Sequence, residues 1–526
     1  MTEGPRFHTL TELLDHAVAR DGYIVHEGQT ISYAQLRDRS QRVAAGLAAA
    51  GLRRGDHVGL SMPNSPDWLV MFFACARLGV AVMILNTRLA VSELSDLLVR
   101  SDAKGLIWQG EAQPRLSLSP QDAQVMSQLR LIATPAGGAD VDGVASAAVT
   151  PFDALLAHPP RLAADAQPDD PVLLFSTSGS TGKSKLVLHC QRGIAGHASQ
   201  VVQAMGLDAP GTVHFMPLPL AGAYGLVQTM VMIASGCKLV MPAGFNPAQS
   251  ADLIREHGVT QLFLFDDAIA QILKAVGPQP QHPFPTVRWC AYGIFNPELK
   301  DFVASTEARG IRLVGLYGLS ETQAFFVCER PGDPVELRTR TGGFTVSPQA
   351  SFRIRDTETG QLLGPGQLGE IELKGPSVML RYYGNTPAQA QMLDDGFFRT
   401  GDSGQIGPDG SLVFNSRIDD VLRLSGFLVT TGEIESVIAQ APEVEACVVV
   451  GIRVAQGNRP VAFVKPKAGA AIDPARLLAF CAERLAKYKL PIGFHAVDKF
   501  PVGGSLNAPK VDKKALREQA ARLHPH

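Results

Sequence analysis

The sequence predicts an α/β protein with a large N-terminal domain and a small α+β C-terminal domain. Short apolar runs alternate with helical patterns over residues 7–110 and 190–316, which predicts two doubly wound, mainly parallel sheets covered by helices. Between about residues 341 and 415, Gly and Pro are frequent and short alternating runs predict an antiparallel sheet or small barrel. We place the N-terminal domain at residues 1–417 and a compact C-terminal domain at 418–526.

Composition limits the classes of function. The 526 residues are 45% hydrophobic and 19% charged, as in ordinary globular proteins, and the formal net charge is −2. Such a balance gives no basis for a nucleic-acid or anionic-membrane partner. The seven cysteines contain no C-x-x-C pair, which fits a reducing, cytoplasmic location. No signal peptide is evident, and no apolar run approaches the roughly 18 residues of a membrane span.

The first doubly wound unit has a clear helix start. Ser65 is a favourable N-cap and Pro66 a favourable first residue, so we expect a helix from here to Gly79. The following elements are expected at Val80–Leu85 (strand), Leu94–Val99 (helix) and Gly105–Trp108 (strand). Residues 115–170 are rich in Ala, Pro, Gly and Asp, and we expect them to be a long excursion with weak structure.

The later elements follow the same patterns. In the second unit we expect helices at Cys190–Met205 and Pro247–His257, and strands at Cys237–Met241, Val259–Phe265, Val287–Ala291 and Arg312–Leu316. In the antiparallel region we expect strands at Ser351–Arg355 and Gly369–Leu373, with hairpin turns at Asp356–Gly360 and Pro408–Gly410. In the C-terminal domain we expect a helix from Glu433, strands at Ala446–Val450, Val461–Val464 and Phe494–Val497, a helix at Pro474–Leu485 and a basic tail.

The segment Ser176–Lys185 carries the strongest chemical signal. It follows the apolar run Val172–Phe175, which reads as a buried strand, and it is rich in Ser, Thr, Gly and Lys without any acid. Hydroxyls, backbone N–H groups and lysines can surround phosphate oxygens. It is not a P-loop, because Thr177 stands at the first glycine position and Lys185–His189 reads as a strand instead of a helix. We favour a phosphate-binding loop between two strands over a plain polar hairpin.

Four further motifs are weaker when taken singly. Gly315–Glu321 ends a strand, where ligands bind in open α/β sheets, and it offers a stacking ring, a hydroxyl and a carboxylate suited to Mg²⁺. Phe397–Asp402 places an acid after a Thr-Gly turn, where it could accept hydrogen bonds from a ribose diol. Arg417–Arg423 and Pro509–Lys514 are charged segments near the domain boundary and the C-terminus. Each has a purely structural alternative, a turn or a solvated charge run.

Together these motifs resemble the adenylate-forming superfamily of acyl-CoA synthetases, adenylation domains of peptide synthetases and beetle luciferases. The resemblance covers about residues 10–517 and is closest to acyl- or aryl-CoA ligases. The matching stretches are Ser176–Lys185, Tyr317–Glu321, Gly369–Ile371, Thr400–Asp402, Arg417–Asp420, Ser425–Gly426 and Glu433–Glu435.

The resemblance implies a role for each matching position. Phosphate contacts would come from Thr177, Ser178, Gly179, Ser180, Thr181, Gly182 and Lys183. Adenine would lie against Tyr292, Gly293, Ile294 and Tyr317, and ribose against Asp402 and Arg417. The catalytic residues would be Ser320, Glu321 as the Mg²⁺ ligand, and Lys510, with Lys513 and Lys514 as competing assignments. The acyl pocket would include Tyr224, Gly225, Phe295, Gly318 and Gln323, the hinge Asp419, and the CoA tunnel Ser425 and Gly426.

The chain also departs from the family pattern. Gly222 stands where the family often has a His beside the substrate carboxylate, and Tyr224 could partly substitute for it. The adenine loop reads Gly293-Ile294-Phe295 instead of the usual Gly-Ala-Pro. The acyl pocket carries no obvious cation, so we expect an apolar aromatic or medium-chain monocarboxylic acid.

The implied reaction has two steps and uses ATP, Mg²⁺ and coenzyme A. The substrate carboxylate attacks the α-phosphate of ATP, giving an acyl-adenylate and pyrophosphate, and the small domain rotates before the CoA thiol releases AMP. Two alternatives stay open: a stand-alone ligase that loads the pantetheine of a carrier protein, and a non-catalytic nucleotide-binding protein. We also leave open a homodimer.

Overall fold

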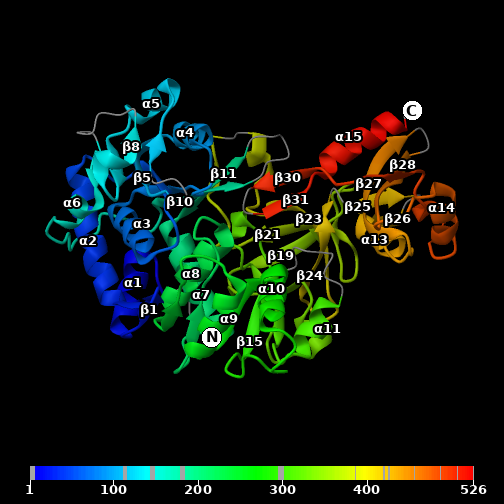
Figure 1. The fold of residues 1–526 in the computed structure, drawn as a ribbon, viewed down its shortest axis with the longest axis horizontal. Helices are drawn as coiled ribbons and strands as arrows, with labels where there is room; N and C mark the ends of the chain where they lie inside the picture. Colours follow the sequence, from blue (N-terminus) through cyan, green and yellow to red (C-terminus); the bar gives the residue numbers. More distant parts are fainter. Residues whose placement is uncertain are drawn as a thin grey trace. The chain divides into compact units, whose positions relative to one another are not determined.

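We analysed a computed structural model of the chain (Figure 1). It describes residues 6–110, 115–142, 149–177, 184–293, 301–384, 387–418, 421–424, 427–454, 457–485, 487–505 and 508–524. The chain forms two compact units, one of residues 1–351 and 374–398, the other of residues 352–373 and 399–526. The functional boundary expected between residues 417 and 418 stays a prediction.

The first unit contains an eight-stranded sheet in the order β22-β11-β10-β4-β3-β5-β7-β9. From β10 to β9 all neighbours are parallel, whereas β11 is antiparallel to both β10 and β22. Its strands are β3 (His57–Ser61), β4 (Ala81–Ile84), β5 (Ala103–Trp108), β7 (Leu131–Thr134), β9 (Val149–Pro151), β10 (Pro171–Thr177), β11 (Lys185–Cys190) and β22 (Arg381–Tyr383). The expected, mainly parallel sheet is confirmed. The predicted phosphate loop connects β10 to β11.

The expectation of weak structure over residues 115–170 is wrong. Strands β7 and β9 extend the sheet beyond β5. Along the chain, helix α5 (Pro120–Met126) precedes β7, and the short helix α6 (Phe152–Leu156) follows β9. Leu131, Ile132 and Ala133 are buried, so the apolar run of β7 has the burial of a core strand. The short strand pair β6 (Leu116–Ser117) and β8 (Val141–Asp142) completes this part of the described chain.

A second set of strands in the first unit has the order β2-β1-β13-β12-β14-β15-β16-β17-β18. The stretch from β1 to β16 is parallel, and β2, β17 and β18 pair antiparallel. The strands are β1 (Tyr23–His26), β2 (Gln29–Ser32), β12 (Val213–Phe215), β13 (Lys238–Val240), β14 (Gln261–Phe265), β15 (Trp289–Gly293), β16 (Leu313–Tyr317), β17 (Val327–Cys328) and β18 (Gly342–Thr345). These strands form the second of the two doubly wound sheets that the sequence predicts, and both sheets belong to the first compact unit.

Helices of the first unit cover these sheets (Figure 1). The longer ones are α1 (Leu10–Ala19), α2 (Tyr33–Ala49), α3 (Pro66–Leu78), α4 (Val91–Arg100), α7 (Gln191–Met205), α8 (Ala223–Ser235), α9 (Pro247–Glu256) and α10 (Asp266–Val276). Helix α3 begins as predicted, because the Ser65 side chain accepts a hydrogen bond from the Trp68 backbone, and it ends at Gly79 with φ 71°. All its residues except Asp67 are buried, so it is a core helix, and α7 packs against α8 beside the same core.

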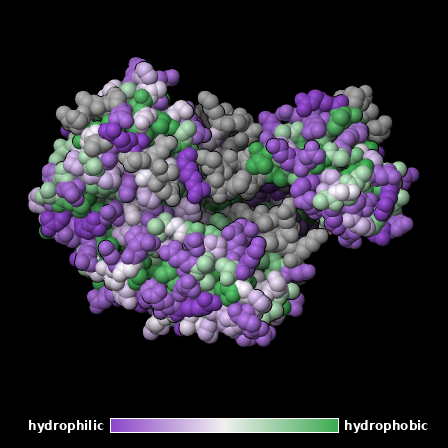
Figure 2. All heavy atoms as spheres, in the orientation of Figure 1, coloured by the Kyte–Doolittle hydropathy of each residue, from purple (hydrophilic) through white to green (hydrophobic). Residues whose placement is uncertain are grey.

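The visible surface is mainly hydrophilic, and apolar residues occur on it as scattered patches (Figure 2). The largest buried side chains include Trp68, Tyr292, Tyr382 and Phe325. Within the described ranges, no helix combines the length and apolar character that crossing a bilayer requires.

The second unit begins with the predicted antiparallel strands. They are ordered β24-β23-β21-β19-β20, with β19 (Ser351–Arg355), β20 (Leu362–Leu363), β21 (Gly369–Lys374), β23 (Phe398–Ile406) and β24 (Leu412–Arg417). The hairpins β19–β20 and β23–β24 close at the two expected turns.

The rest of the second unit is a small α+β arrangement. A three-stranded sheet of β27 (Val444–Val454), β28 (Gly457–Pro466) and β29 (Phe494–Ala496) has α13 (Thr431–Ile438) and α14 (Pro474–Ala482) on one face. Helix α15 (Lys513–Leu523) packs Leu516 and Ala520 against the other face. Two hairpins accompany them, β25 (Val421–Leu424) with β26 (Phe427–Thr430) and β30 (Val502–Ser505) with β31 (Ala508–Val511). The expected basic tail is therefore an amphipathic helix, which the Asp512 side chain caps.

Candidate active site

The predicted phosphate loop joins two paired strands. β10 and β11 run antiparallel with Thr177 opposite Lys185, so both ends of the loop are fixed by the sheet. Arg100 of α4 donates hydrogen bonds to the hydroxyl and carbonyl oxygens of Ser184 and so anchors the exit of the loop. The loop residues Ser178, Gly179, Ser180, Thr181, Gly182 and Lys183 lie outside the described residues.

Glu321 lies on a turn that a buried histidine supports. The 3₁₀ turn Ser320–Thr322 follows β16, and the Ser320 carbonyl accepts a 2.8 Å hydrogen bond from Nε2 of His189. Burial lowers the pKa of His189 to about 4, so the ring is neutral near pH 7. Because a carbonyl can only accept, Nε2 carries the proton of that neutral ring. His189 thereby links the strand after the phosphate loop to the turn that carries Ser320 and Glu321.

Tyr382 connects the same strand to the carboxylate of Glu321. Tyr382 lies opposite Val187 in the β11–β22 pairing, and its hydroxyl donates a 2.8 Å hydrogen bond to Oε1 of Glu321. Nζ of Lys185 lies 4.7 Å from the centre of the Tyr382 ring and donates a 2.7 Å hydrogen bond to Gln391. Sequence reasoning missed Tyr382 and His189, because their partners are 61 and 131 residues away in the chain.

The predicted adenine residues end two neighbouring strands. Tyr317 is the last residue of β16 and Gly293 the last of β15, at the carboxyl ends of the strands. The Tyr292 ring is 1% exposed and its hydroxyl donates a 2.7 Å hydrogen bond to the Thr339 carbonyl. The Tyr292 ring therefore packs inside the protein at this strand end, and Gly293 beside it is buried as well. Ile294 and Phe295 lie outside the described residues.

The predicted acyl-pocket residues share one region. The Tyr224 ring, near the start of α8, lies 4.9 Å from the Phe265 ring and stacks at 5.5 Å on the Phe325 ring. Gln323 is fully buried and donates from Nε2 to the Ser377 carbonyl at 3.3 Å. Gly225 and Gly318 have a packing role as well. A Cβ on Gly225 would lie 2.2 Å from the Pro219 carbonyl oxygen, and a Cβ on Gly318 would lie 2.5 Å from the Ala324 backbone.

In the second unit, Asp402 and Arg417 face each other across β23 and β24. They are register partners, and Nη1 of Arg417 lies 2.9 Å from Oδ1 of Asp402. The carboxylate is 4% exposed while the guanidinium is 56% exposed, so the pair joins a buried acid to an accessible cation. The Thr400 hydroxyl donates to the Ile371 carbonyl at 2.8 Å and accepts from the Asp402 backbone at 3.0 Å, which fixes the strand around Gly401.

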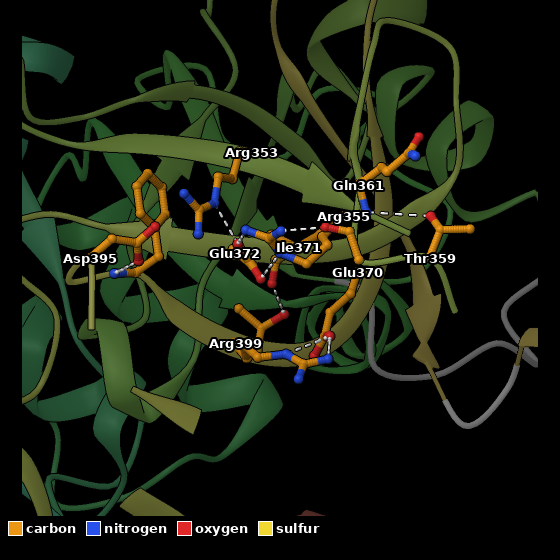
Figure 3. A network of polar contacts seen from close by, with 12 residues as sticks. Arg353, Arg355, Thr359, Gln361, Glu370, Ile371, Glu372, Asp395 and Arg399 are labelled. Atoms are coloured by element: carbon orange, nitrogen blue, oxygen red, sulfur yellow. Dashed lines mark hydrogen bonds and ion pairs between the residues drawn. The ribbon is translucent and has the colours of Figure 1, made fainter. Parts of the chain in front are cut away.

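Carboxylates on β21 link this strand to β19 and β23 (Figure 3). Buried Glu372 pairs with both Arg353 and Arg355, the latter at 2.6 Å. Glu370 pairs with Arg399 and also accepts a 3.3 Å hydrogen bond from the Gly401 backbone. The predicted Gly369–Ile371 motif thus has a visible structural role, since Glu370 positions the turn that precedes Asp402.

The competing lysines differ in their surroundings. Lys510 lies in β31 opposite Gly503, and its side chain is outside the described part of the structure. Lys513 begins α15, and its Nζ lies 3.3 Å from the Thr431 hydroxyl and 3.4 Å from the Glu435 carboxylate. Lys514, next on the helix, is exposed. The predicted hinge Asp419 and the tunnel residues Ser425 and Gly426 lie outside the described residues.

Comparison with known families fits this geometry. The family model for AMP-binding enzymes matches residues 13–383, and the model for the AMP-binding enzyme C-terminal domain matches residues 433–505. The chain belongs to the AMP-binding enzyme family. The resemblance to adenylate-forming enzymes that the motifs predict is confirmed, and with it the class of AMP-forming acid–thiol ligases.

Similar proteins cover nearly the whole AMP-binding chain. A feruloyl-CoA synthase of Amycolatopsis sp is 30% identical over 509 residues, covering 93% of this chain and 94% of that protein. An indoleacetate–CoA ligase of Aromatoleum aromaticum is 29% identical over 495 residues, covering 94% of each. Among solved structures, ATP-bound MatB from Rhodopseudomonas palustris superposes with a TM-score of 0.81 at 26% identity, over 98% of this chain and 99% of that one.

Proposed function

We propose that this AMP-binding enzyme joins a carboxylic acid to coenzyme A at the expense of ATP, through an acyl-adenylate. The acid is aromatic or medium-chain. The observation that carries the proposal is the placement of Glu321 on a supported turn, linked through Tyr382 and His189 to the strand that follows the phosphate loop. Sequence relatives named as aryl- and acyl-CoA ligases over the full length support it.

The residues that match the family motifs would divide the work of binding ATP. Lys183 and the hydroxyls of the loop after Thr177 would bind the β- and γ-phosphates, and Tyr317 with the Gly293 backbone would flank adenine. Asp402 would accept hydrogen bonds from the ribose hydroxyls while Arg417 holds its carboxylate in place. The short Arg417–Asp402 pair supports this role, because it fixes a carboxylate that is otherwise costly to bury.

The donor set around Glu321 fits Mg²⁺. Oε1 of Glu321 accepts from Tyr382, and Oε2 has no hydrogen-bond partner among the described residues, so one hard oxygen is open. In the part of the chain that the structure describes, no group of three or more His, Cys, Asp or Glu could hold a metal by itself. Mg²⁺ at Glu321 would take its other ligands from ATP phosphates and water, and would supply positive charge to the phosphates.

In the first step the acid's carboxylate oxygen bonds to the α-phosphorus of ATP and the bond to pyrophosphate breaks. Lys510 would offset the negative charge that grows on the α-phosphate, and Lys183 would hold the departing pyrophosphate. Lys513, paired with Glu435, is less suited to that task, which supports the choice of Lys510.

In the second step the CoA sulfur attacks the acyl carbon and AMP departs. A domain of residues 418–526 would turn about Asp419, withdraw Lys510, and bring Ser425 and Gly426 to the thiol path. Together with the domain boundary, these assignments rest on the motif match.

The test is an acid panel assayed for pyrophosphate release and, by mass spectrometry, for thioester, with and without CoA. We expect release with aromatic or medium-chain acids and a thioester when CoA is present. Release that never yields acyl-CoA, but acylates a pantetheine-bearing carrier protein, supports the carrier-loading alternative. Nucleotide binding without release for any acid supports the non-catalytic alternative.

A cytoplasmic location and a homodimer are further parts of this proposal. Reduced, widely separated cysteines support the first. Cell fractionation and sedimentation of the purified protein would test them.

A further inference from the structure

Helices α7 and α8 and the turn at Gln323 bury polar side-chain atoms that have no hydrogen-bond partner among the described residues. His197, Gln200, Gln228 and Gln323, which we call the buried polar cluster, are each no more than 1% exposed. Both ring nitrogens of His197, both amide atoms of Gln200 and of Gln228, and Oε1 of Gln323 make no hydrogen bond within the described residues. An unpaired buried polar group costs about 1–3 kcal/mol, so such a cluster calls for a partner from outside the protein.

The cluster residues come from α7, from α8 and from the loop between β16 and β17. On α7, Gly193, His197 and Gln200 recur at helical spacing on one face, and a Cβ on Gly193 would lie 3.3 Å from Nε2 of Gln323. The Gln323 side chain therefore lies against that face of α7. His197 also lies near the Gln323 backbone, as the effect of that backbone on the pKa of the ring indicates.

The loop between β16 and β17, which carries Gln323, also contacts α8. The Phe325 backbone donates a 2.8 Å hydrogen bond to the Gln323 carbonyl, and the Phe325 ring stacks on Tyr224. Gln228 lies one turn beyond Tyr224 on α8. Burial raises the pKa of the Tyr224 phenol, and a weak contact with the Gln228 side chain opposes that rise. The Tyr224 hydroxyl, too, lacks a hydrogen-bond partner among the described residues. Aromatic rings and unpaired polar groups thus meet where the acid is proposed to bind.

The cluster carries no charge. Residues 193–205 of α7, all of α8 and the segment 322–328 contain no Lys, Arg, Asp or Glu. Burial lowers the pKa of His197 to about 3 and raises that of Tyr224, so both are neutral near pH 7. A charged group brought here would be buried without a counter-charge, which is strongly unfavourable. A neutral imidazole and amides offer both donors and acceptors to an uncharged polar group.

We infer that His197, Gln200 and Gln228 are specificity-determining residues, and that the acid this enzyme activates is aromatic and carries an uncharged hydrogen-bonding substituent, such as a hydroxyl or ring N–H. The aromatic body lies against Tyr224 and Phe325, and the substituent pairs with the cluster. This inference rests on the proposed ligase function and narrows its substrate class. It disfavours acids with a second carboxylate or an ammonium group.

The test compares matched acids that differ in one substituent. The probes are the 4-hydroxy, 4-methyl and unsubstituted forms of benzoate, phenylacetate and cinnamate, with terephthalate as the charged form. The readout is kcat/KM for pyrophosphate release. We expect a hydroxyl form to exceed its methyl form by about 10-fold to 100-fold on at least one scaffold, since an unmet buried hydrogen bond costs that much. Terephthalate should be the poorest benzoate.

Substitutions in the buried polar cluster test which side chains cause the preference for a hydroxyl over a methyl group. Gln228→Met and Gln200→Met keep the volume and remove the polar atoms, and His197→Leu does the same for the ring. In the first two the hydroxyl-to-methyl ratio should fall at least about fivefold, toward one. Thr212→Val is the matched control, because Thr212 is buried with an unpaired hydroxyl but lies after α7 and outside the cluster. Its ratio should stay at the wild-type value.

The outcomes separate the two levels of the proposal. Turnover of several acids with a hydroxyl-to-methyl ratio at or below one on every scaffold overturns the inference and leaves the ligase function intact. So does a ratio that Gln228→Met and Gln200→Met leave unchanged, because the two amides would then not contact the substituent. Absence of pyrophosphate release with every acid rejects the proposed function itself.

Discussion

The Tyr382 hydroxyl donates a 2.8 Å hydrogen bond to Oε1 of Glu321 across 61 residues of sequence. The same tyrosine ring supports the ammonium of Lys185, which follows the phosphate loop. One side chain therefore orients the carboxylate proposed to bind Mg²⁺ and a cation beside the loop proposed to bind phosphate. This relationship gives the first prediction.

Tyr382→Phe should lower kcat/KM for adenylation about tenfold and raise the Mg²⁺ concentration needed for half-maximal rate. The ring under Lys185 remains, while the hydrogen bond to the carboxylate, of about 1.5 kcal/mol, is lost. The measurement is acid-dependent pyrophosphate release over a Mg²⁺ series. Tyr383→Phe removes the hydroxyl of the adjacent residue and serves as the control. An unchanged Mg²⁺ dependence in Tyr382→Phe would show that Glu321 does not need this contact.

Asp402→Asn should raise the KM for ATP roughly 10-fold to 100-fold with a smaller effect on the KM for the acid. The substitution removes the charge that strengthens hydrogen bonds to hydroxyl groups, which is worth about 1.5–3 kcal/mol. Steady-state kinetics with ATP varied at saturating acid provide the measurement. Asp409→Asn, in the turn between the same two strands, is the control. Equal effects of both variants would contradict a ribose contact by Asp402.

Lys510→Ala should cut adenylate formation about 10²-fold to 10³-fold and spare thioester formation from supplied acyl-AMP and CoA, because its charge is needed only in the first step. Lys513→Ala should leave both half-reactions near wild type and lower stability slightly, since it removes an ion pair with Glu435. Each half-reaction is measured separately by single turnover. A first step that fails in Lys513→Ala and persists in Lys510→Ala reverses the assignment.

Stability should fall as the pH drops from 7 to 5. Burial lowers the pKa of His214, as of His189, to about 4, while the unfolded value is 6.5. Between these values the unfolded chain binds more protons than the native one, so the free energy of unfolding increases with pH. Each such histidine should account for about 2 kcal/mol between pH 7 and pH 5.

Urea unfolding of wild type and His214→Gln at both pH values measures this effect. His214 contacts Ser235 and lies outside the candidate site, so its removal isolates the protonation term. The variant should lose about 2 kcal/mol less than wild type on acidification. An identical loss in both proteins would show that His214 is protonated in the native state.

The sequence predicted elements well where local signals were complete. Ser65, Pro66 and Gly79 define both ends of α3, and the break at Lys185 correctly separated the loop from a P-loop. The expectation for residues 115–170 was wrong because β7 and β9 are short strands that depend on pairing, β7 with β5 and β9 with β7, and composition does not reveal such contacts. The helix in the basic tail was not predicted, although Asp512, Leu516 and Ala520 carry a cap and an apolar stripe.

Site prediction had a similar limit. Glu321, Asp402 and Arg417 belong to short motifs, so they could be proposed one stretch at a time. Tyr382 and His189 act through partners far along the chain and have no local signature. The polarity of the proposed acid site was also hidden, because Gln200 and Gln228 look like ordinary helical residues until their burial is known.

The most direct test of the central claim is exchange of labelled pyrophosphate into ATP without CoA. Adenylation is reversible, so the enzyme should incorporate label into ATP only when a suitable aromatic or medium-chain acid is present, and Glu321→Gln should lose most of that exchange. Exchange that does not depend on any carboxylic acid, or its absence with a broad acid panel despite bound ATP, would contradict the account.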